Sequence, residues 1–265
     1  MKKTLMYEQL TDLYPLFRES MEERKGTEKT ETNFIARIFK GSKFLTKSVI
    51  DLGGGIGMHA KELAKRGYEV TVFDQSQRAL RIARMGFPKL KTIQGRFEAI
   101  ATRQTFDVAI CLWSTFPYIL TDKGRKNFFN WLKTHIKYLI ILDEANFHRY
   151  LKMKEFHKIY KLVEDKRYRL TLTRDWIISS TGLRKTSYVY TITDRKTEKQ
   201  KIIQDWEVQQ YLSVDEIQKY LGGSWKLKGV FGDFKPNSRF DKQSSPRLIS
   251  VFERKESIPK SLRSQ

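Results

Sequence analysis

Residues 49–57 read VIDLGGGIG, a short apolar segment that runs directly into a glycine-rich turn. Gly53, Gly55 and Gly57 alternate along this turn, and a helix is predicted from Met58 to Arg66. Glycine allows the positive φ angles of a tight turn and leaves the backbone bare, so that a ligand can approach it closely. The order strand, glycine turn, helix predicts an α/β fold with a ligand at the turn. Taken alone, the same glycines would also suit an ordinary strand–helix loop.

Strands and helices alternate along the chain after this turn. Further strands are predicted at 69–73, 90–94, 106–113 and 138–143, with helices at 77–85 and 122–132. Such alternation is typical of a parallel sheet that is covered by helices on both faces. Two more helices are predicted before the first strand, within Tyr7–Phe39.

The pattern changes after Asp143. A basic helix is predicted from Phe147 to Val163, and segments rich in β-forming residues follow at 169–176, 183–193 and 201–212. Ser213 and Glu216 form a capping box for another helix, and the last strands are predicted at 225–231 and 247–253. The predicted fold class is therefore α/β. It has a Rossmann-like, seven-stranded, mostly parallel sheet with helices on both faces and a small antiparallel β insert.

The composition narrows the kind of protein. The 265 residues include 51 Lys and Arg against 30 Asp and Glu, a formal net charge of +21. That excess can mark a nucleic-acid-binding surface, but the basic residues are spread along the chain, and a lysine-rich background proteome gives the same excess. One cysteine, Cys111, and four scattered histidines predict neither a disulfide framework nor a metal site. The apolar stretches are too short to span a membrane and the N-terminus lacks a signal-peptide core, so a soluble cytoplasmic protein is expected.

Two carboxylates flank the glycine turn and indicate its ligand. Asp74 ends the second strand, where its carboxylate could accept hydrogen bonds from both hydroxyls of a ribose; a helix N-cap is the alternative role. Asp51 directly precedes the turn, where it disfavours a diphosphate and favours a sulfonium or an ammonium group. The glycines also depart from the G-x-G-x-x-G dinucleotide fingerprint. The turn is therefore predicted to bind S-adenosylmethionine (SAM) rather than a nicotinamide dinucleotide.

From Val49 to Arg84 the sequence resembles the class I SAM-dependent methyltransferases. More narrowly, it is similar to the small-molecule branch that includes sugar N,N-dimethyltransferases and glycine N-methyltransferase-like enzymes. The stretches 105–119, 229–234 and 245–249 resemble the same branch, so the resemblance extends over 7–255.

The resemblance implies roles for the residues around the turn. The backbone of four glycines should hold the methionine part of SAM, Asp51 should lie near its sulfonium or amino group, and Asp74 with Gln75 should lie at the ribose. Tyr14 should belong to an N-terminal helix that folds over the cofactor, although a core aromatic would have the same spacing. The four glycines are Gly53, Gly54, Gly55 and Gly57.

The loop after the third strand departs from the family. Its members usually place an aspartate there to accept a hydrogen bond from the adenine amino group, whereas this chain has Gly95-Arg96-Phe97-Glu98. A guanidinium has no acceptor atom. Adenine recognition is therefore expected to pass to backbone groups, to Glu98 or to stacking on Phe97, and Arg96 stays a cofactor-site candidate whose role is open.

The end of the fourth strand, residues 112–118, is expected to face the transferred methyl group. Leu112 and Trp113 are assigned to the cofactor, and Tyr118 is assigned to orienting the acceptor, with packing as the alternative. His148 is the best-placed histidine for a general base, although a surface histidine is the alternative. His59 is expected to support the glycine turn.

These residues predict methyl transfer from SAM to an N or O atom of a small-molecule acceptor by in-line displacement, mainly through alignment of the acceptor. An RNA or tRNA methyltransferase that uses the basic surface is one alternative. The Asn/Asp-Pro-Pro-aromatic motif of base-modifying enzymes is missing after the fourth strand. A non-catalytic binding protein on a methyltransferase fold is the other alternative. Four aromatic residues of the insert could line the acceptor or form a buried face: Trp176, Tyr188, Tyr190 and Trp206.

The expected organisation has five parts. Residues 1–47 form an N-terminal helical lid, 48–147 the SAM-binding core, and 148–212 a helix with an antiparallel β insert on the acceptor side. Residues 213–256 add a C-terminal helix and the last two strands of the core sheet, and 257–265 form a flexible tail. The sequence gives no expectation for the oligomeric state.

Overall fold

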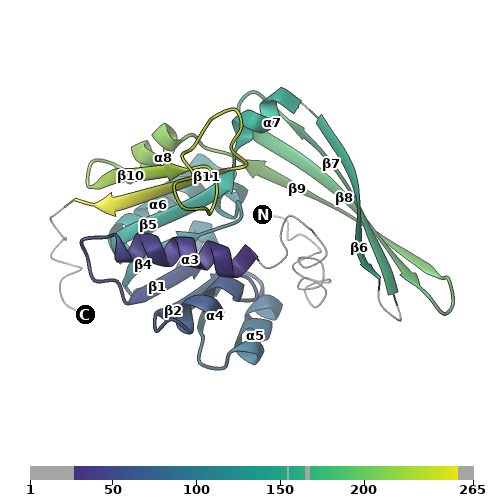
Figure 1. Ribbon diagram of the computed structural model, residues 1–265, viewed down its shortest axis with the longest axis horizontal. Helices are drawn as coiled ribbons and strands as arrows, with labels where there is room; N and C mark the ends of the chain where they lie inside the picture. The colour runs from purple at the N-terminus through teal and green to yellow at the C-terminus, as the bar shows by residue number, and fades with distance from the viewer. Residues whose placement is uncertain (1–26, 154, 165–167, 256–265) are drawn as a thin grey trace.

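The computed structural model describes residues 27–153, 155–164 and 168–255, and these form two β-sheets with helices around the larger one (Figure 1). The four-stranded sheet extends away from the helix-covered sheet as a long arm, at the right of the view. Tyr14, the first of the two predicted N-terminal helices and the predicted tail lie outside the described residues. No helix in the described part of the chain is both long enough and apolar enough to cross a membrane.

The larger sheet has seven strands in the order β10-β11-β5-β4-β1-β2-β3. Strands β1 to β5 are parallel, and β11 runs antiparallel to both of its neighbours. The predicted seven-stranded, mostly parallel sheet is therefore confirmed. The strands are β1 (Ser48–Leu52), β2 (Glu69–Asp74), β3 (Lys91–Gln94), β4 (Phe106–Cys111), β5 (Ile136–Ala145), β10 (Trp225–Phe231) and β11 (Arg247–Arg254).

Helices cover both faces of this sheet because successive residues of its buried strands point to opposite sides. Val49, on one side of β1, packs with α3, α4 and α5, while Ile50, on the other side, packs with α6 and α8. The helices are α3 (Thr27–Lys40), α4 (Met58–Ala64), α5 (Gln77–Gly86), α6 (Asp122–His135), α7 (Phe147–Met153) and α8 (Val214–Leu221). The predicted capping box of α8 is present.

The chain order places a topological switch point beside β1. After β1 the chain continues outward through β2 and β3, then returns to the other side of β1 as β4. Ligands of open α/β sheets bind at such a point, at the carboxyl ends of the strands. The glycine turn after β1 and residues 112–118 after β4 therefore face each other at this edge of the sheet.

The smaller sheet is larger than the sequence predicted. Its four antiparallel strands have 10 to 12 residues each: β6 (Glu155–Glu164), β7 (Tyr168–Ile178), β8 (Leu183–Asp194) and β9 (Gln200–Gln210). The helix predicted from Phe147 to Val163 is wrong beyond Met153. Phe156, Ile159, Tyr160 and Val163 have helical spacing, but this segment pairs with β7 along its length. Tertiary pairing overrides local pattern here.

The four aromatic residues that were considered together in the sequence do not all lie on one face of the smaller sheet. Trp176 and Tyr190 are buried on the inner face, and Tyr188 is directed to the same side by its place on β8. Trp206 pairs with Ser187 and therefore lies on the outer face. The outer face carries four large apolar side chains that are 50% to 63% exposed: Ile159, Ile177, Ile202 and Trp206. Trp206 is therefore separated from the other three aromatics by the sheet itself.

Candidate active site

Three glycines of the turn have left-handed backbone conformations. Gly53 has φ +73°, Gly55 has φ +56° and Gly57 has φ +75°. Side chains with a Cβ are disfavoured at such angles, so the turn needs glycine at these positions. The amide N–H of Gly53 donates to the carbonyl of Phe73 over 2.7 Å, which ties the turn to the end of β2.

The turn is closely packed on one side and open on the other. A Cβ at Gly53 would lie 2.2 Å from Cγ2 of Thr115, and one at Gly54 would lie 2.5 Å from Oδ2 of Asp51. A Cβ at Gly55 would meet no atom within 4 Å. Among the described residues, the bare backbone of Gly55 therefore faces open space.

Asp51 is a buried carboxylate with an unsatisfied oxygen. It is 2% exposed, and its Oδ2 has no hydrogen-bond partner among the described residues. Burial raises the pKa of Asp51 to about 6, His59 nearby lowers it, and Asp74 raises it. At neutral pH this group is therefore mostly ionised, and within the described residues it forms no ion pair, so a positively charged ligand at the turn would stabilise it.

Asp74 braces the turn from the end of β2. Its Oδ2 accepts a hydrogen bond from the Gly55 amide over 3.0 Å, and its Oδ1 accepts one from the Ser76 amide over 2.8 Å. The N-cap of α5 is Ser76, whose Oγ accepts from the amide of Ala79. A carboxylate has about four acceptor positions. Bracing the turn is therefore compatible with a ribose contact.

Unsatisfied acceptor atoms lie at the carboxyl ends of three neighbouring strands. Besides Oδ2 of Asp51 near the end of β1, they are Oε1 of Gln75 after β2 and Oε2 of Glu98, in the 3-10 helix η2 (Phe97–Ala99) after β3. All three are buried and have no partner among the described residues. Strands β1, β2 and β3 are adjacent in the sheet, so these acceptors lie along one edge. A ligand rich in amino and hydroxyl groups would satisfy them.

The structure gives different surroundings to Phe97 and Glu98, which the sequence offered for adenine recognition, and to Arg96, whose role was open. Phe97 is buried and stacks on Phe73, with a ring-centroid separation of 5.9 Å. Arg96 is exposed and forms an ion pair with Oε1 of Glu98 at 3.6 Å. Of the side chains considered for adenine, Glu98 is the one with an unsatisfied acceptor.

The loop after β4 contains two consecutive non-glycine residues with positive φ, Trp113 at +57° and Ser114 at +59°. Each such residue costs about 1–3 kcal/mol. The carboxylate of Asp143 on β5 accepts from the Trp113 amide over 2.7 Å, and its carbonyl accepts from the Ser114 amide over 3.0 Å. The Ser114 hydroxyl accepts from the Ala145 amide over 2.8 Å. Tertiary hydrogen bonds therefore hold this conformation.

Arg247 on β11 completes the anchor of the loop. Its Nε and a terminal nitrogen donate to the two carboxylate oxygens of Asp143 over 2.8 and 2.5 Å. Its guanidinium also lies over the Trp113 ring, 4.7 Å from the centroid. A planar guanidinium suits both contacts, because it binds a carboxylate through two hydrogen bonds and stacks on an aromatic face.

The Trp113 indole connects the loop to the helices above it. Its Nε1 donates to Oε2 of Glu31 on α3 over 3.0 Å, and the same oxygen is hydrogen-bonded to Nε2 of His59 on α4. His59 therefore lies behind the glycine turn, where a supporting residue was expected. Leu112 is buried in the core on the same side of the sheet.

Tyr118 joins the loop to the smaller sheet. It ends the 3-10 helix η3 (Phe116–Tyr118), and its hydroxyl donates to Oε2 of Glu207 on β9. Oε1 of Glu207 accepts from the Tyr188 hydroxyl over 2.5 Å and lies 3.4 Å from Arg184. Glu207 is thus a buried carboxylate on which two phenols and a guanidinium converge.

His148 is half-buried near the start of α7, beside the ring of Phe147. Burial and the positive charge of Lys242 lower the pKa of His148, which keeps the imidazole neutral at pH 7. Within the described residues, no hydrogen bond joins it to Tyr118 or to the glycine turn.

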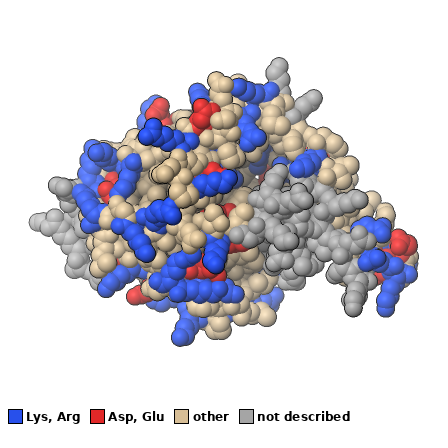
Figure 2. Space-filling view, in the orientation of Figure 1, with Lys and Arg blue, Asp and Glu red and all other residues tan. Residues whose placement is uncertain are grey.

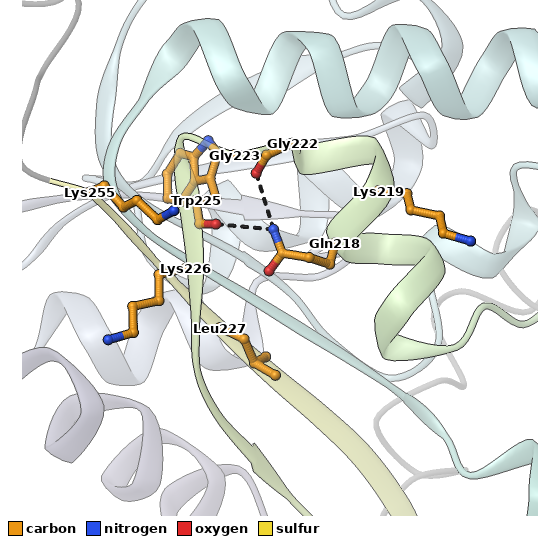
Figure 3. Close-up of a pocket in the computed structure, with 8 residues that line it drawn as sticks. All are labelled: Gln218, Lys219, Gly222, Gly223, Trp225, Lys226, Leu227 and Lys255. Atoms are coloured by element: carbon orange, nitrogen blue, oxygen red, sulfur yellow. Dashed lines mark hydrogen bonds between the residues drawn. The ribbon is translucent and has the colours of Figure 1, made fainter.

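A separate depression of about 470 Å³ lies at the far edge of the large sheet, between the end of α8 and the start of β10 (Figure 3). There the side-chain amide of Gln218 donates to the carbonyls of Gly222 and Trp225 over 3.1 and 3.0 Å. Three lysines and no carboxylate or histidine line it: Lys219, Lys226 and Lys255. Lysine is the one titratable residue type among the described residues that line it, and the depression is distant in strand order from the glycine turn.

Several residues of this site had little or no signal in the sequence that marked them as site residues. Glu31, Asp143, Glu207 and Arg247 belong to different elements, and each reaches residues 112–118 only through the fold. Asp143 had a weak signal, because it lies near the carboxyl end of a predicted parallel strand, where sites of α/β proteins lie.

Residues 49–138 match the model of a methyltransferase domain family. The chain contains a methyltransferase domain. The predicted resemblance to the small-molecule branch of the class I SAM-dependent methyltransferases is confirmed, and so is SAM as the cofactor of this domain. The matched segment begins in β1, contains the glycine turn and Asp74, and ends in β5.

The chain is also similar to a glycine/sarcosine N-methyltransferase from Parasynechococcus marenigrum, with 30% identity over 129 residues. That match covers 46% of this chain and 45% of the relative, so it spans less than half of either protein.

Solved structures show that the fold extends over nearly the whole chain. A SAM-dependent methyltransferase from Clostridium acetobutylicum superposes with a TM-score of 0.76 at 16% identity, covering 93% of this chain and 98% of that one. A methyltransferase from Streptomyces caelestis gives 0.75 at 15% identity, with 96% and 99% covered. A sugar N-methyltransferase from Streptoalloteichus gives 0.72 at 14%, with 92% and 93% covered. At these identities the likeness is one of fold, and it includes the smaller sheet.

Proposed function

We propose that this protein transfers the methyl group of SAM to a nitrogen atom of a small-molecule amine. The observation that carries the proposal is Asp51, a buried, ionisable carboxylate beside a bare glycine backbone, whose Oδ2 has no hydrogen-bond partner among the described residues. A cationic ligand satisfies that oxygen, whereas a diphosphate is repelled by it. Asp51→Asn should therefore weaken binding of SAM.

The residues along the edge of β1, β2 and β3 would hold SAM. The backbone at Gly55 has room for the methionine part, Asp51 faces a positive group, and Asp74 with Gln75 offers acceptors to the ribose. Glu98 offers an unsatisfied acceptor to the adenine amino group. When bound, SAM supplies a methyl group on a positively charged sulfur, which is already activated for displacement.

The remaining task of the protein is to align the acceptor and to exclude water. An amine with a free lone pair needs alignment more than it needs a strong base. Tyr118 and the inner face of the smaller sheet provide the wall opposite the glycine turn in this proposal. His148, which burial keeps neutral, serves as the candidate base. We further propose the division of the chain into a lid at 1–47, a cofactor core at 48–147 and an acceptor wall at 148–212, completed by 213–256.

A nitrogen acceptor is supported by the similar proteins, which include glycine/sarcosine and sugar N-methyltransferases. An RNA acceptor has less support. Figure 2 shows that Lys and Arg side chains spread over the visible face with acidic side chains among them, rather than gathering in one patch. A wide distribution of charge strengthens general attraction to polyanions without defining a binding path.

Two measurements test the proposal. Calorimetric titration with SAM should show binding that Asp51→Asn weakens and that Asp215→Asn, a matched change at an exposed position of α8, leaves unchanged. Transfer of labelled methyl groups should then be assayed on glycine, sarcosine, an amino sugar and bulk tRNA. Label in an amine supports the proposal. Absence of SAM binding, or label in tRNA alone, overturns it.

A further inference from the structure

We propose that Gln209, near the C-terminal end of β9, is a positioning residue that holds the Trp113–Ser114 backbone opposite the glycine turn. This inference rests on the proposed function, because it assigns a role in cofactor binding to a residue of the acceptor-side sheet. Its basis is a hydrogen bond from Nε2 of Gln209 to the carbonyl oxygen of Ser114 over 2.7 Å. Both residues are buried.

The hydrogen bond meets the loop where its backbone is least favourable. Trp113 and Ser114 are both left-handed, and the peptide groups around them point in directions that no regular element satisfies. Asp143 accepts from both amides of this pair. The carbonyl of Ser114 accepts a hydrogen bond from the side-chain amide of Gln209. A buried carbonyl that loses its donor is costly, so removal of Gln209 should release the loop.

The side-chain amide of Gln209 is itself fixed in one orientation. Its Oε1 accepts hydrogen bonds from the hydroxyl of Tyr211, over 3.0 Å, and from the guanidinium of Arg184. Because both donors converge on the oxygen, the nitrogen must face Ser114. Gln209 therefore transmits the position of the smaller sheet to the loop.

Strand β9 holds the loop at two places. Gln209 contacts Ser114, and Glu207, two residues earlier on the same face of β9, accepts from Tyr118 at the other end of the loop. Thr115 lies between these two anchors and packs against Gly53. A displacement of β9 would thus move Thr115 relative to the glycine turn. Occupancy of the acceptor wall and affinity for the cofactor should therefore be coupled, each changing the other by the same factor.

Isosteric variants separate this role from simple packing. Gln209→Glu keeps an acceptor for Tyr211 and Arg184 but cannot donate to the Ser114 carbonyl. Gln209→Leu removes both functions. The matched controls are Gln204→Glu and Gln204→Leu, which make the same changes at an exposed position of β9. All five proteins are titrated calorimetrically with S-adenosylhomocysteine, and hydrogen exchange of the peptide 112–118 is followed by mass spectrometry.

Both Gln209 variants should bind S-adenosylhomocysteine about tenfold more weakly than wild type and exchange faster in 112–118, while both controls match wild type. Wild-type affinity and exchange in Gln209→Glu would overturn the inference, even if Gln209→Leu fails to fold. If wild type binds no S-adenosylhomocysteine, the proposed function fails instead. The exchange of 112–118 in Gln209→Glu then still decides whether Gln209 positions the loop.

Discussion

The two loops that meet at the switch point reach the same backbone conformation by different means. In the turn after β1, positive φ angles fall on Gly53, Gly55 and Gly57, which adopt them at little cost. In the loop after β4 they fall on Trp113 and Ser114, which do not. Seven consecutive residues are enough to allow the conformation of the first loop. The conformation of the second loop depends on contacts with distant parts of the fold.

The loops also differ in how their polar groups are satisfied. The loop after β4 has its strained amides, its hydroxyl and its carbonyl paired with Asp143, Ala145 and Gln209. The glycine turn keeps Asp51 with an oxygen that has no partner among the described residues. A loop whose strained groups are paired is held in one conformation, whereas an unsatisfied carboxylate is a group that a ligand can satisfy. Four predictions test this contrast.

The largest effect is expected from Asp143→Asn. The substitution leaves the mostly buried guanidinium of Arg247 without a carboxylate, and breaking a buried pair in this way costs about 3–5 kcal/mol of the free energy of unfolding. Urea denaturation measures this loss of stability. Asp233→Asn, which breaks a surface pair with Lys235 at 3.3 Å, should cost less than about 1 kcal/mol. Equal stability of the two variants would mean that the loop does not depend on its anchor.

Asp51→Asn should instead increase the free energy of unfolding at neutral pH. The folded-state pKa of Asp51 is raised from 3.8 to about 6, so the unfolded chain ionises first and wild-type stability falls as pH rises between these values. The asparagine variant lacks this loss. At pH 7 it should be more stable than wild type by roughly 3 kcal/mol, and below pH 4 the two should converge. Denaturation curves from pH 3 to 8 measure the difference, and a constant gap would contradict the assignment.

Gly53→Ala tests the close contact between the two loops. The new Cβ would lie 2.2 Å from Cγ2 of Thr115, at a φ that disfavours alanine. Gly67→Ala, at φ +89° in open space, carries the backbone cost alone. Gly53→Ala should therefore cost about 2 kcal/mol more than Gly67→Ala in thermal or urea unfolding. Adding Thr115→Ser, which deletes Cγ2, should restore part of that difference; no restoration would place the strain elsewhere.

The smallest effect concerns the pH dependence of cofactor binding. A cation pairs with ionised Asp51, and ionisation is lost as pH falls through about 6. Affinity for SAM should therefore fall about tenfold between pH 7 and pH 5. Calorimetric titration of Asp51→Asn should show a weaker affinity that changes little over the same range. Parallel slopes for both proteins would assign the pH dependence to another group.

The same contrast explains which features were predictable. The glycine turn, the capping box of α8 and the seven-stranded sheet follow from local chemistry and from alternation along the chain, so the sequence alone indicated them. The helix predicted through Val163 failed because Phe156 and Ile159 fit a helical spacing as well as a strand, and only pairing with β7 decides between them. Local pattern carries no information about a partner strand.

The contacts on the proposed acceptor side were harder to predict from the sequence for the same reason. Tyr118 and Trp113 were singled out by their position after the fourth strand, but their partners are distant in sequence. Glu207 lies 89 residues after Tyr118, and Glu31 lies 82 residues before Trp113. Nothing in the spacing of these residues signals a contact. Phe97 was singled out as a stacking residue because aromatic character alone does not distinguish a ligand platform from a core ring.

The double attachment of β9 to residues 112–118 limits how this protein can be re-engineered. If the four-stranded arm forms the acceptor wall as proposed, exchanging it between relatives would be one route to a different acceptor. Yet Glu207 and Gln209 form hydrogen bonds to one particular loop of the large-sheet domain, residues 112–118. A chimera that exchanges the arm alone would lose these two hydrogen bonds to the loop. The loop and the arm therefore have to be exchanged together.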